Sequence, residues 1–210
     1  MPILTSDSPS IQHLCKADKR LAKTIGLVGQ ISYRNHSDRF AFIVHEIIEQ
    51  MLSAKAGNRI YARLRELCSG RISPASILKH SEDEIKGIGT ARSKARAILG
   101  VAEAIREKKL DLKAFDTQSD EEVIRNLTML RGIGPWSAKM FLIFCLDRPD
   151  VVPFEDVAFL QGLSWTYGRE IRTRDEVLKV CRKWHPYASI GARYMYYALD
   201  MGLTKQKMRK

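Results

Sequence analysis

Residues 130–139 read LRGIGPWSAK, in which two glycines flank one isoleucine between two segments of helical pattern. Glycine adopts positive φ without steric cost, so Gly132 and Gly134 allow a tight turn. Pro135 suits the first turn of the following helix, where its missing N–H costs nothing. The N–H groups at that helix start attract anions. The run predicts a helical hairpin whose turn binds a phosphate, directly or through a Na⁺ or K⁺ ion at the backbone of Gly132 and Gly134.

A second copy of this turn lies upstream, because residues 86–89 and 131–134 both read basic-Gly-Ile-Gly. Each copy follows an acidic helical segment. Ser81 and Ser119 are the expected N-caps of those segments, and a glutamate three residues later completes a capping box in each. A Gly-Ile-Gly turn on its own is also compatible with a plain helical hairpin that binds nothing.

Outside the hairpin, apolar residues recur at helical spacing along most of the chain. We expect helices over residues 11–30, 40–54 and 60–68, with Asp38 as the N-cap of the second. Period-2 alternation is scarce, and only residues 150–153 are briefly extended. The fold class is therefore predicted to be all-α.

The composition favours a folded protein with a polyanionic partner. The chain has 210 residues, 45% of them hydrophobic, and a formal net charge of +11. Such a basic excess indicates nucleic acid ahead of a membrane surface. The first 15 residues lack the apolar region of a secretory signal, and no apolar run is long enough to span a bilayer. The cysteines are too widely spaced for a zinc or iron–sulfur motif and are expected to be reduced: Cys15, Cys68, Cys145 and Cys181.

The hairpin sequence resembles the helix-hairpin-helix motif of the base-excision DNA glycosylases, L-x-G-[VI]-G-x-x-[TS]-A. The likeness extends over about residues 15–200 and is greatest to the alkylation-repair branch, typified by 3-methyladenine DNA glycosylase II. It rests on three further segments: the helix with Gln50, Ser53 and Lys55, the run DVVPFEDVA at residues 150–158, and WHPY at residues 184–187. The resemblance implies a two-lobed helical fold with a DNA-binding cleft between the lobes.

The resemblance also implies that Asp156 is the catalytic carboxylate. Its position before a helical run equally describes an N-cap, and the two roles are compatible because a helix N-terminus favours a negative charge. Glu155 is the neighbouring alternative. The position where bifunctional relatives have a nucleophilic lysine holds Trp136, which predicts a monofunctional hydrolase with water as the nucleophile. Lys139, one helical turn later, leaves a lyase activity open.

A cationic alkylated base is a good leaving group, and aromatic rings recognise it by cation–π stacking after it is flipped out of the duplex. The resemblance implies a pocket tryptophan at Trp136, and Tyr33 and Trp184 are further candidates, although core packing also accounts for them. Met51, or Leu52 next to it, is expected to fill the gap left in the DNA, unless both are core residues. The expected DNA contacts are Gly132, Gly134, Arg131, Ser137, Lys139, Gln50, Met51, Leu52, Ser53 and Lys55.

We therefore expect residues 1–39 and 150–210 to form one lobe, and residues 40–149 to form the lobe with the hairpin at about residues 121–146. The resemblance implies a monomeric repair enzyme that hydrolyses the N-glycosidic bond of alkylated purines, 3-methyladenine among them, in double-stranded DNA. The enzyme is expected to need no cofactor beyond the hairpin cation and no membrane. It is expected to act in the cytoplasm or nucleoid, or in a eukaryotic nucleus. Two alternatives stay open: a glycosylase for an oxidised or deaminated base, and a non-catalytic DNA-binding module.

Overall fold

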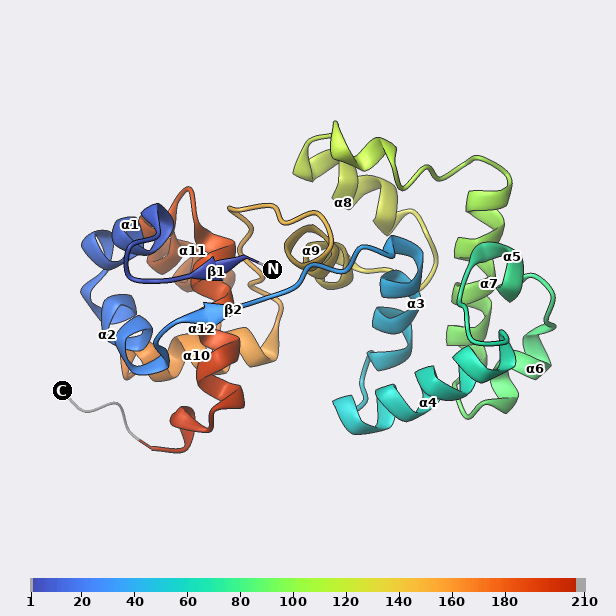
Figure 1. Cartoon of the computed structure of the whole chain (residues 1–210), viewed down its shortest axis with the longest axis horizontal. Helices are drawn as coiled ribbons and strands as arrows, with labels where there is room; N and C mark the ends of the chain where they lie inside the picture. Colours follow the sequence, from blue (N-terminus) through green and yellow to red (C-terminus); the bar gives the residue numbers. More distant parts are fainter. Residues whose placement is uncertain (1, 207–210) are drawn as a thin grey trace. The chain divides into compact units, whose positions relative to one another are not determined.

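The computed structural model describes residues 2–206, and that part of the chain is almost entirely helical (Figure 1). It contains twelve α-helices and one pair of two-residue strands, which confirms the all-α prediction. The chain divides into two compact units. Unit 1 takes the N-terminal residues up to Asn35 and the C-terminal residues from Asp147 onward, and unit 2 is His36–Leu146.

The division lies at residues 35/36 and 146/147, where the sequence suggested 39/40 and 149/150. A hydrogen bond from the backbone N–H of His36 to the carbonyl of Phe144, 2.8 Å long, ties the start of unit 2 to its last helix. The ring of His36 also packs against Phe42. Residues 36–39 therefore belong to the hairpin-bearing unit.

Unit 1 is built around one hydrophobic core. Its elements are β1 (Ile3–Leu4), α1 (Pro9–Ala17), α2 (Lys19–Val28), β2 (Ile31–Ser32), α10 (Val157–Tyr167), α11 (Arg174–Cys181), η2 (Arg182–Trp184), α12 (Ala188–Asp200) and η3 (Leu203–Lys205). Trp184 and Tyr194 are among the largest fully buried side chains of the core. The antiparallel pairing of β1 with β2 was not expected from the sequence.

The single helix expected over residues 11–30 is wrong, because the chain breaks at Asp18 into α1 and α2. Asp18 has extended backbone angles, and its carboxylate accepts hydrogen bonds from the backbone N–H groups of Arg20 and Leu21. It is thus the N-cap of α2. The same side chain is 2% exposed and reaches Tyr167 and Trp184 of the core.

Unit 2 holds the remaining helices, and local sequence signals set several of their starts. The elements are α3 (Arg39–Glu49), α4 (Ala54–Leu67), α5 (Pro74–Ile77), α6 (Glu82–Gly87), α7 (Arg92–Arg106), η1 (Ala114–Asp116), α8 (Asp120–Thr128) and α9 (Pro135–Phe144). Asp38 caps α3, and complete capping boxes start α6 at Ser81 and α8 at Ser119. These three caps confirm the sequence prediction. Among residues 2–206, no helix has both the length and the apolarity needed to cross a membrane.

Candidate functional site

The hairpin of unit 2 consists of α8, the turn through Gly132 to Gly134, and α9. Gly132 has φ of 85°, and a Cβ added there would lie 2.6 Å from the Cβ of Ala97 on α7. Ile133 is 6% exposed and anchors the turn in the core. Gly134 is the N-cap of α9, with φ of −100° and ψ of 176°, and no side chain caps this helix start. The turn therefore presents the backbone N–H groups of an uncapped helix, which is the arrangement that binds phosphate.

Gly132→Ala is expected to destabilise unit 2 by about 2–5 kcal/mol, because left-handed backbone costs an alanine about 1–2 kcal/mol and overpacking against Ala97 about 1–3 kcal/mol. Urea denaturation checks this value. Gly134→Ala is the matched control, since its φ suits alanine and nothing lies within 4 Å of the added Cβ. It should cost at most about 1 kcal/mol. Equal losses in the two variants would contradict the packing argument.

The end of α3 is hydrogen-bonded to the hairpin through Gln50. The Nε2 atom of Gln50 donates to the carbonyl oxygen of Gly132 at 2.8 Å and to the Oγ atom of Ser137 at 3.3 Å. Ser137 is 5% exposed, so the prediction that its side chain contacts DNA is corrected. Its hydroxyl instead holds Gln50, and through Gln50 the turn after α3 is fixed beside the Gly132 turn.

Lys94 fixes the same turn from α7, a role that the sequence did not reveal. Its Nζ atom donates to the carbonyl oxygens of Ile48 at 2.8 Å and Gln50 at 2.6 Å, which lie at the end of α3. Burial lowers the pKa of this lysine. Because each partner is a backbone atom, only the folded chain shows which lysine serves this purpose.

Met51 is the most exposed apolar side chain in the turn held by Gln50 and Lys94. It is 101% exposed, and its φ of 60° is unusual for a residue with a side chain. Leu52 is 41% exposed. The alternative that both are core residues is therefore wrong. A fully exposed methionine with strained backbone angles, on a turn held by hydrogen bonds from Gln50 and Lys94, is typical of an interaction site.

The other predicted DNA contacts differ in their exposure. Arg131, Ser53 and Lys55 are exposed, and Ser53 is the N-cap of α4. Lys139 is 8% exposed, so the prediction that it is an exposed phosphate contact is corrected. It belongs to α9, which is buried from Ser137 to Ile143 because nearly every side chain there is apolar. Trp136, at the start of the same helix, is half-buried.

Asp156 lies in unit 1 as the N-cap of α10. Its Oδ1 atom accepts a hydrogen bond from the backbone N–H of Phe159 at 2.6 Å, and the residue is 8% exposed. The next residue, Val157, is 77% exposed. The carboxylate therefore lies at the start of a helix in a fixed orientation, and the residue that follows it in the chain is at the protein surface.

The two other aromatic candidates of unit 1 have different surroundings. Trp184 is fully buried, donates from Nε1 to Asp18 at 3.2 Å, and packs edge-on against Phe159. It is a core residue, so its prediction as a base-pocket residue is corrected. Tyr33 is half-buried beside a cavity of about 320 Å³, and the guanidinium of Arg193 lies 3.7 Å from its ring centre. One face of that ring is therefore already covered by a cation.

Comparison with known proteins agrees with the resemblance seen in the sequence. The family model of the HhH-GPD superfamily base excision DNA repair proteins matches residues 44–186. DNA-3-methyladenine glycosylase 1 of Schizosaccharomyces pombe is 28% identical over 201 residues, which is 92% of this chain and 88% of the relative. The crystal structure of a DNA-3-methyladenine glycosidase from Bacillus halodurans matches with a TM-score of 0.87 at 29% identity, over 99% of this chain and 96% of the other.

A second similar structure contains DNA. It is a 3-methyladenine DNA glycosylase from Schizosaccharomyces pombe in complex with abasic DNA, with a TM-score of 0.82 and 26% identity. The match covers 92% of this chain and 97% of the other. The likeness thus extends over both units of the chain.

Proposed function

Because this chain belongs to the HhH-GPD superfamily of base excision DNA repair proteins, we propose that it removes alkylated purines of the 3-methyladenine type from DNA. It is a DNA repair glycosylase that hydrolyses the N-glycosidic bond. The observation that carries the proposal is Asp156, a carboxylate held by the N–H of Phe159 at the start of α10. Its position in the segment DVVPFEDVA supports the catalytic assignment over that of Glu155.

The chemistry requires little from the protein beyond a fixed negative charge and a water molecule. When the C1′–N bond breaks, the bonding electron pair leaves with the base and C1′ becomes positively charged, as in glycoside hydrolysis. The carboxylate of Asp156 stabilises this charge and orients the attacking water. The water oxygen bonds to C1′, its proton passes to Asp156, and an abasic site remains. A base that carries a positive charge leaves as a neutral molecule, so no strong general acid is needed.

We propose that unit 2 grips the DNA backbone at the uncapped start of α9, with Arg131 and Lys55 as exposed phosphate contacts. Met51 supports this role, because a fully exposed apolar side chain can occupy the gap left by an extruded base. Trp136 and Tyr33 stay predictions as base-pocket residues. A monovalent cation at the backbone of Gly132 and Gly134, a monomeric state, and a location in the cytoplasm, nucleoid or nucleus stay predictions as well.

The test is a base-release assay on duplexes that each contain one modified base: 3-methyladenine, 7-methylguanine, hypoxanthine, 8-oxoguanine or uracil. Chromatography of the released bases should show that much more of the two alkylated purines is released than of the other three bases. Borohydride added during the reaction should trap no covalent adduct, since water is the nucleophile. Release of only the oxidised or deaminated bases would overturn the substrate assignment. No release at all, with DNA binding retained, would identify a binding module instead.

A further inference from the structure

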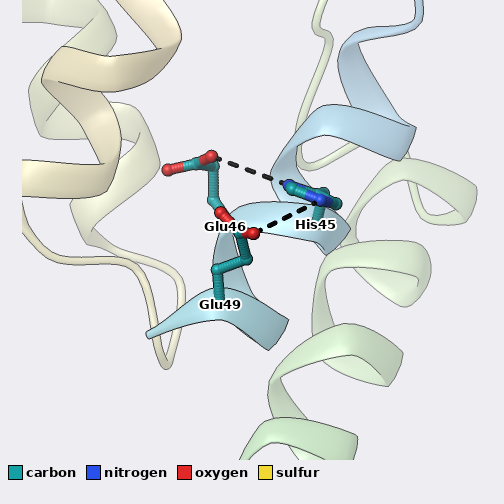
Figure 2. Close-up of side chains that lie close together, drawn as sticks. All are labelled: His45, Glu46 and Glu49. Atoms are coloured by element: carbon teal, nitrogen blue, oxygen red, sulfur yellow. Dashed lines mark ion pairs between the residues drawn. The ribbon is translucent and has the colours of Figure 1, made fainter. Parts of the chain in front are cut away.

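We propose a binding site for a divalent transition-metal ion, Zn²⁺ first, on α3 of unit 2, formed by His45, Glu46 and Glu49 (Figure 2). One ligand atom from each of these three residues fits within 4.8 Å of the other two. Within residues 2–206, this is the one cluster of three or more such side chains. The three residues belong to α3 and are not part of the hairpin segment, and the proposal does not depend on the proposed glycosylase activity.

The spacing of the three residues brings them together on one helix. His45 and Glu49 are four residues apart, so they lie one above the other on the same face of α3. The Nε2 atom of His45 is 3.7 Å from an oxygen of Glu49. Two ligands of a tetrahedral zinc ion with bonds of about 2.0–2.1 Å lie about 3.3 Å apart, so the three side chains must move closer together to bind an ion. An oxygen of Glu46 lies 4.0 Å from Nδ1, and Figure 2 marks one ion pair from each carboxylate to the ring. Because an imidazole binds an ion through one nitrogen, the ion is placed at Nδ1, which both carboxylates reach by small side-chain rotations.

The neighbouring helix α4 completes the site. A Cβ on Gly57 would lie 2.6 Å from the Cγ atom of Glu49, so the absent side chain gives Glu49 the room to turn toward His45. Asn58 places its Oδ1 atom 3.1 Å from Nε2 of His45, where it can accept a hydrogen bond from Nε2–H and leave Nδ1 to the ion. Imidazole and oxygen donors without sulfur suit zinc and its neighbours in the first transition series.

Burial and charge also favour a cation here. The side chains of His45, Glu46 and Glu49 are 25%, 12% and 24% exposed, so they are partly shielded from water and reachable by an ion. The two carboxylates beside the imidazole create a negative potential that attracts a metal ion. A divalent cation would neutralise two partly buried carboxylates, which are costly to keep close together.

In the experiment, the full chain is first treated with a chelator and then titrated with Zn²⁺, and calorimetry measures the binding. We expect one equivalent to bind, and the loss of a ligand in His45→Ala or Glu49→Gln to weaken binding by more than about 100-fold. The matched control is His80→Ala. His80 and Glu84 are also four residues apart, with a ring nitrogen 3.6 Å from the carboxylate, but no third ligand adjoins them in the described part of the chain. This variant should bind Zn²⁺ as the unmodified chain does.

Two further readouts keep the test independent of folding defects. Glu49→Gln preserves the shape of the site, and circular dichroism checks its helix content. With Co²⁺ as the probe, the absorption spectrum should lack the charge-transfer band of cysteine thiolate ligands. Absence of binding at about 100 μM Zn²⁺, unchanged binding in His45→Ala, an equal loss in His80→Ala, or a thiolate band would each overturn the proposal.

Discussion

Replacement of Asp156 by asparagine is expected to reduce the rate of base release by about 10³-fold or more. Loss of one electrostatic contact to the transition state costs about 10²–10³-fold, and loss of a general base costs about 10²–10⁴-fold. Asparagine keeps the shape of the side chain but removes the negative charge that stabilises C1′. The measurement is single-turnover release of an alkylated purine with enzyme in excess, so that product release does not limit the rate.

The same variant should remain folded and should still bind DNA. Asparagine is as good an N-cap as aspartate, so the hydrogen bond from Phe159 to the side-chain oxygen is retained. The weaker interaction with the helix dipole costs about 0.3–1 kcal/mol. Thermal denaturation and a gel-shift assay check these two points.

Glu155→Gln is the matched control for Asp156→Asn. It removes the same charge one residue earlier and is expected to leave the release rate within about tenfold of the unmodified chain, because it does not act on C1′. If Glu155→Gln abolished release and Asp156→Asn did not, the catalytic assignment would pass to Glu155.

The features that the sequence predicted correctly are those set by residues close together along the chain. Ser81 and Ser119 start helices as capping boxes, because each partner lies three residues away. Gly132 was predicted to form a turn, since a backbone with positive φ selects glycine. Asp156 was predicted to begin a helix because aspartate is a preferred N-cap residue. Such signals require no knowledge of the tertiary fold.

The errors concern side chains whose partners are distant in sequence. Ser137 and Lys139 were assigned to DNA, yet α9 is surrounded by other parts of unit 2 and buries both. The apolar run MFLIF that follows is a signal for a helix buried on all sides, and it could have prevented this error. Lys94 gave no such signal, because its partners are backbone carbonyls 44 and 46 residues away. The candidate site was thus predicted in its turns and helix starts, but not in its supporting contacts.

The break at Asp18 has the same origin, since its stabilising partners are Tyr167 and Trp184, 149 and 166 residues away. One carboxylate oxygen caps α2, and the other accepts from the hydroxyl of Tyr167 and from Nε1 of Trp184 at 3.2 Å. Lys183 adds an ion pair at 3.4 Å. The N-terminal and C-terminal segments of unit 1 therefore meet at one buried charge.

Asp18→Ala is expected to lower the free energy of unfolding by about 3–5 kcal/mol, the range for breaking a buried charged network by removing one partner. Alanine leaves the donors of Tyr167 and Trp184 without this acceptor and removes the cap of α2. Urea denaturation followed by tryptophan fluorescence measures the loss. Lys183→Met is the control, because its side chain is 50% exposed and a surface ion pair contributes at most about 1 kcal/mol.

The stabilising effect of Asp18 should depend on pH with a definite sign. Burial alone would raise the pKa of Asp18, but hydrogen bonds from Tyr167, the backbone of Leu21 and Trp184, with the charge of Lys183, lower it below the usual value. A lowered pKa means that the carboxylate stabilises the fold above the unfolded-state pKa of about 3.9. This contribution is lost as the pH falls through the folded-state pKa. The difference in unfolding free energy between the unmodified chain and Asp18→Ala should therefore be full at neutral pH and shrink on acidification below about pH 4. A difference under about 1 kcal/mol at pH 7 would show that the network contributes no more than a surface ion pair.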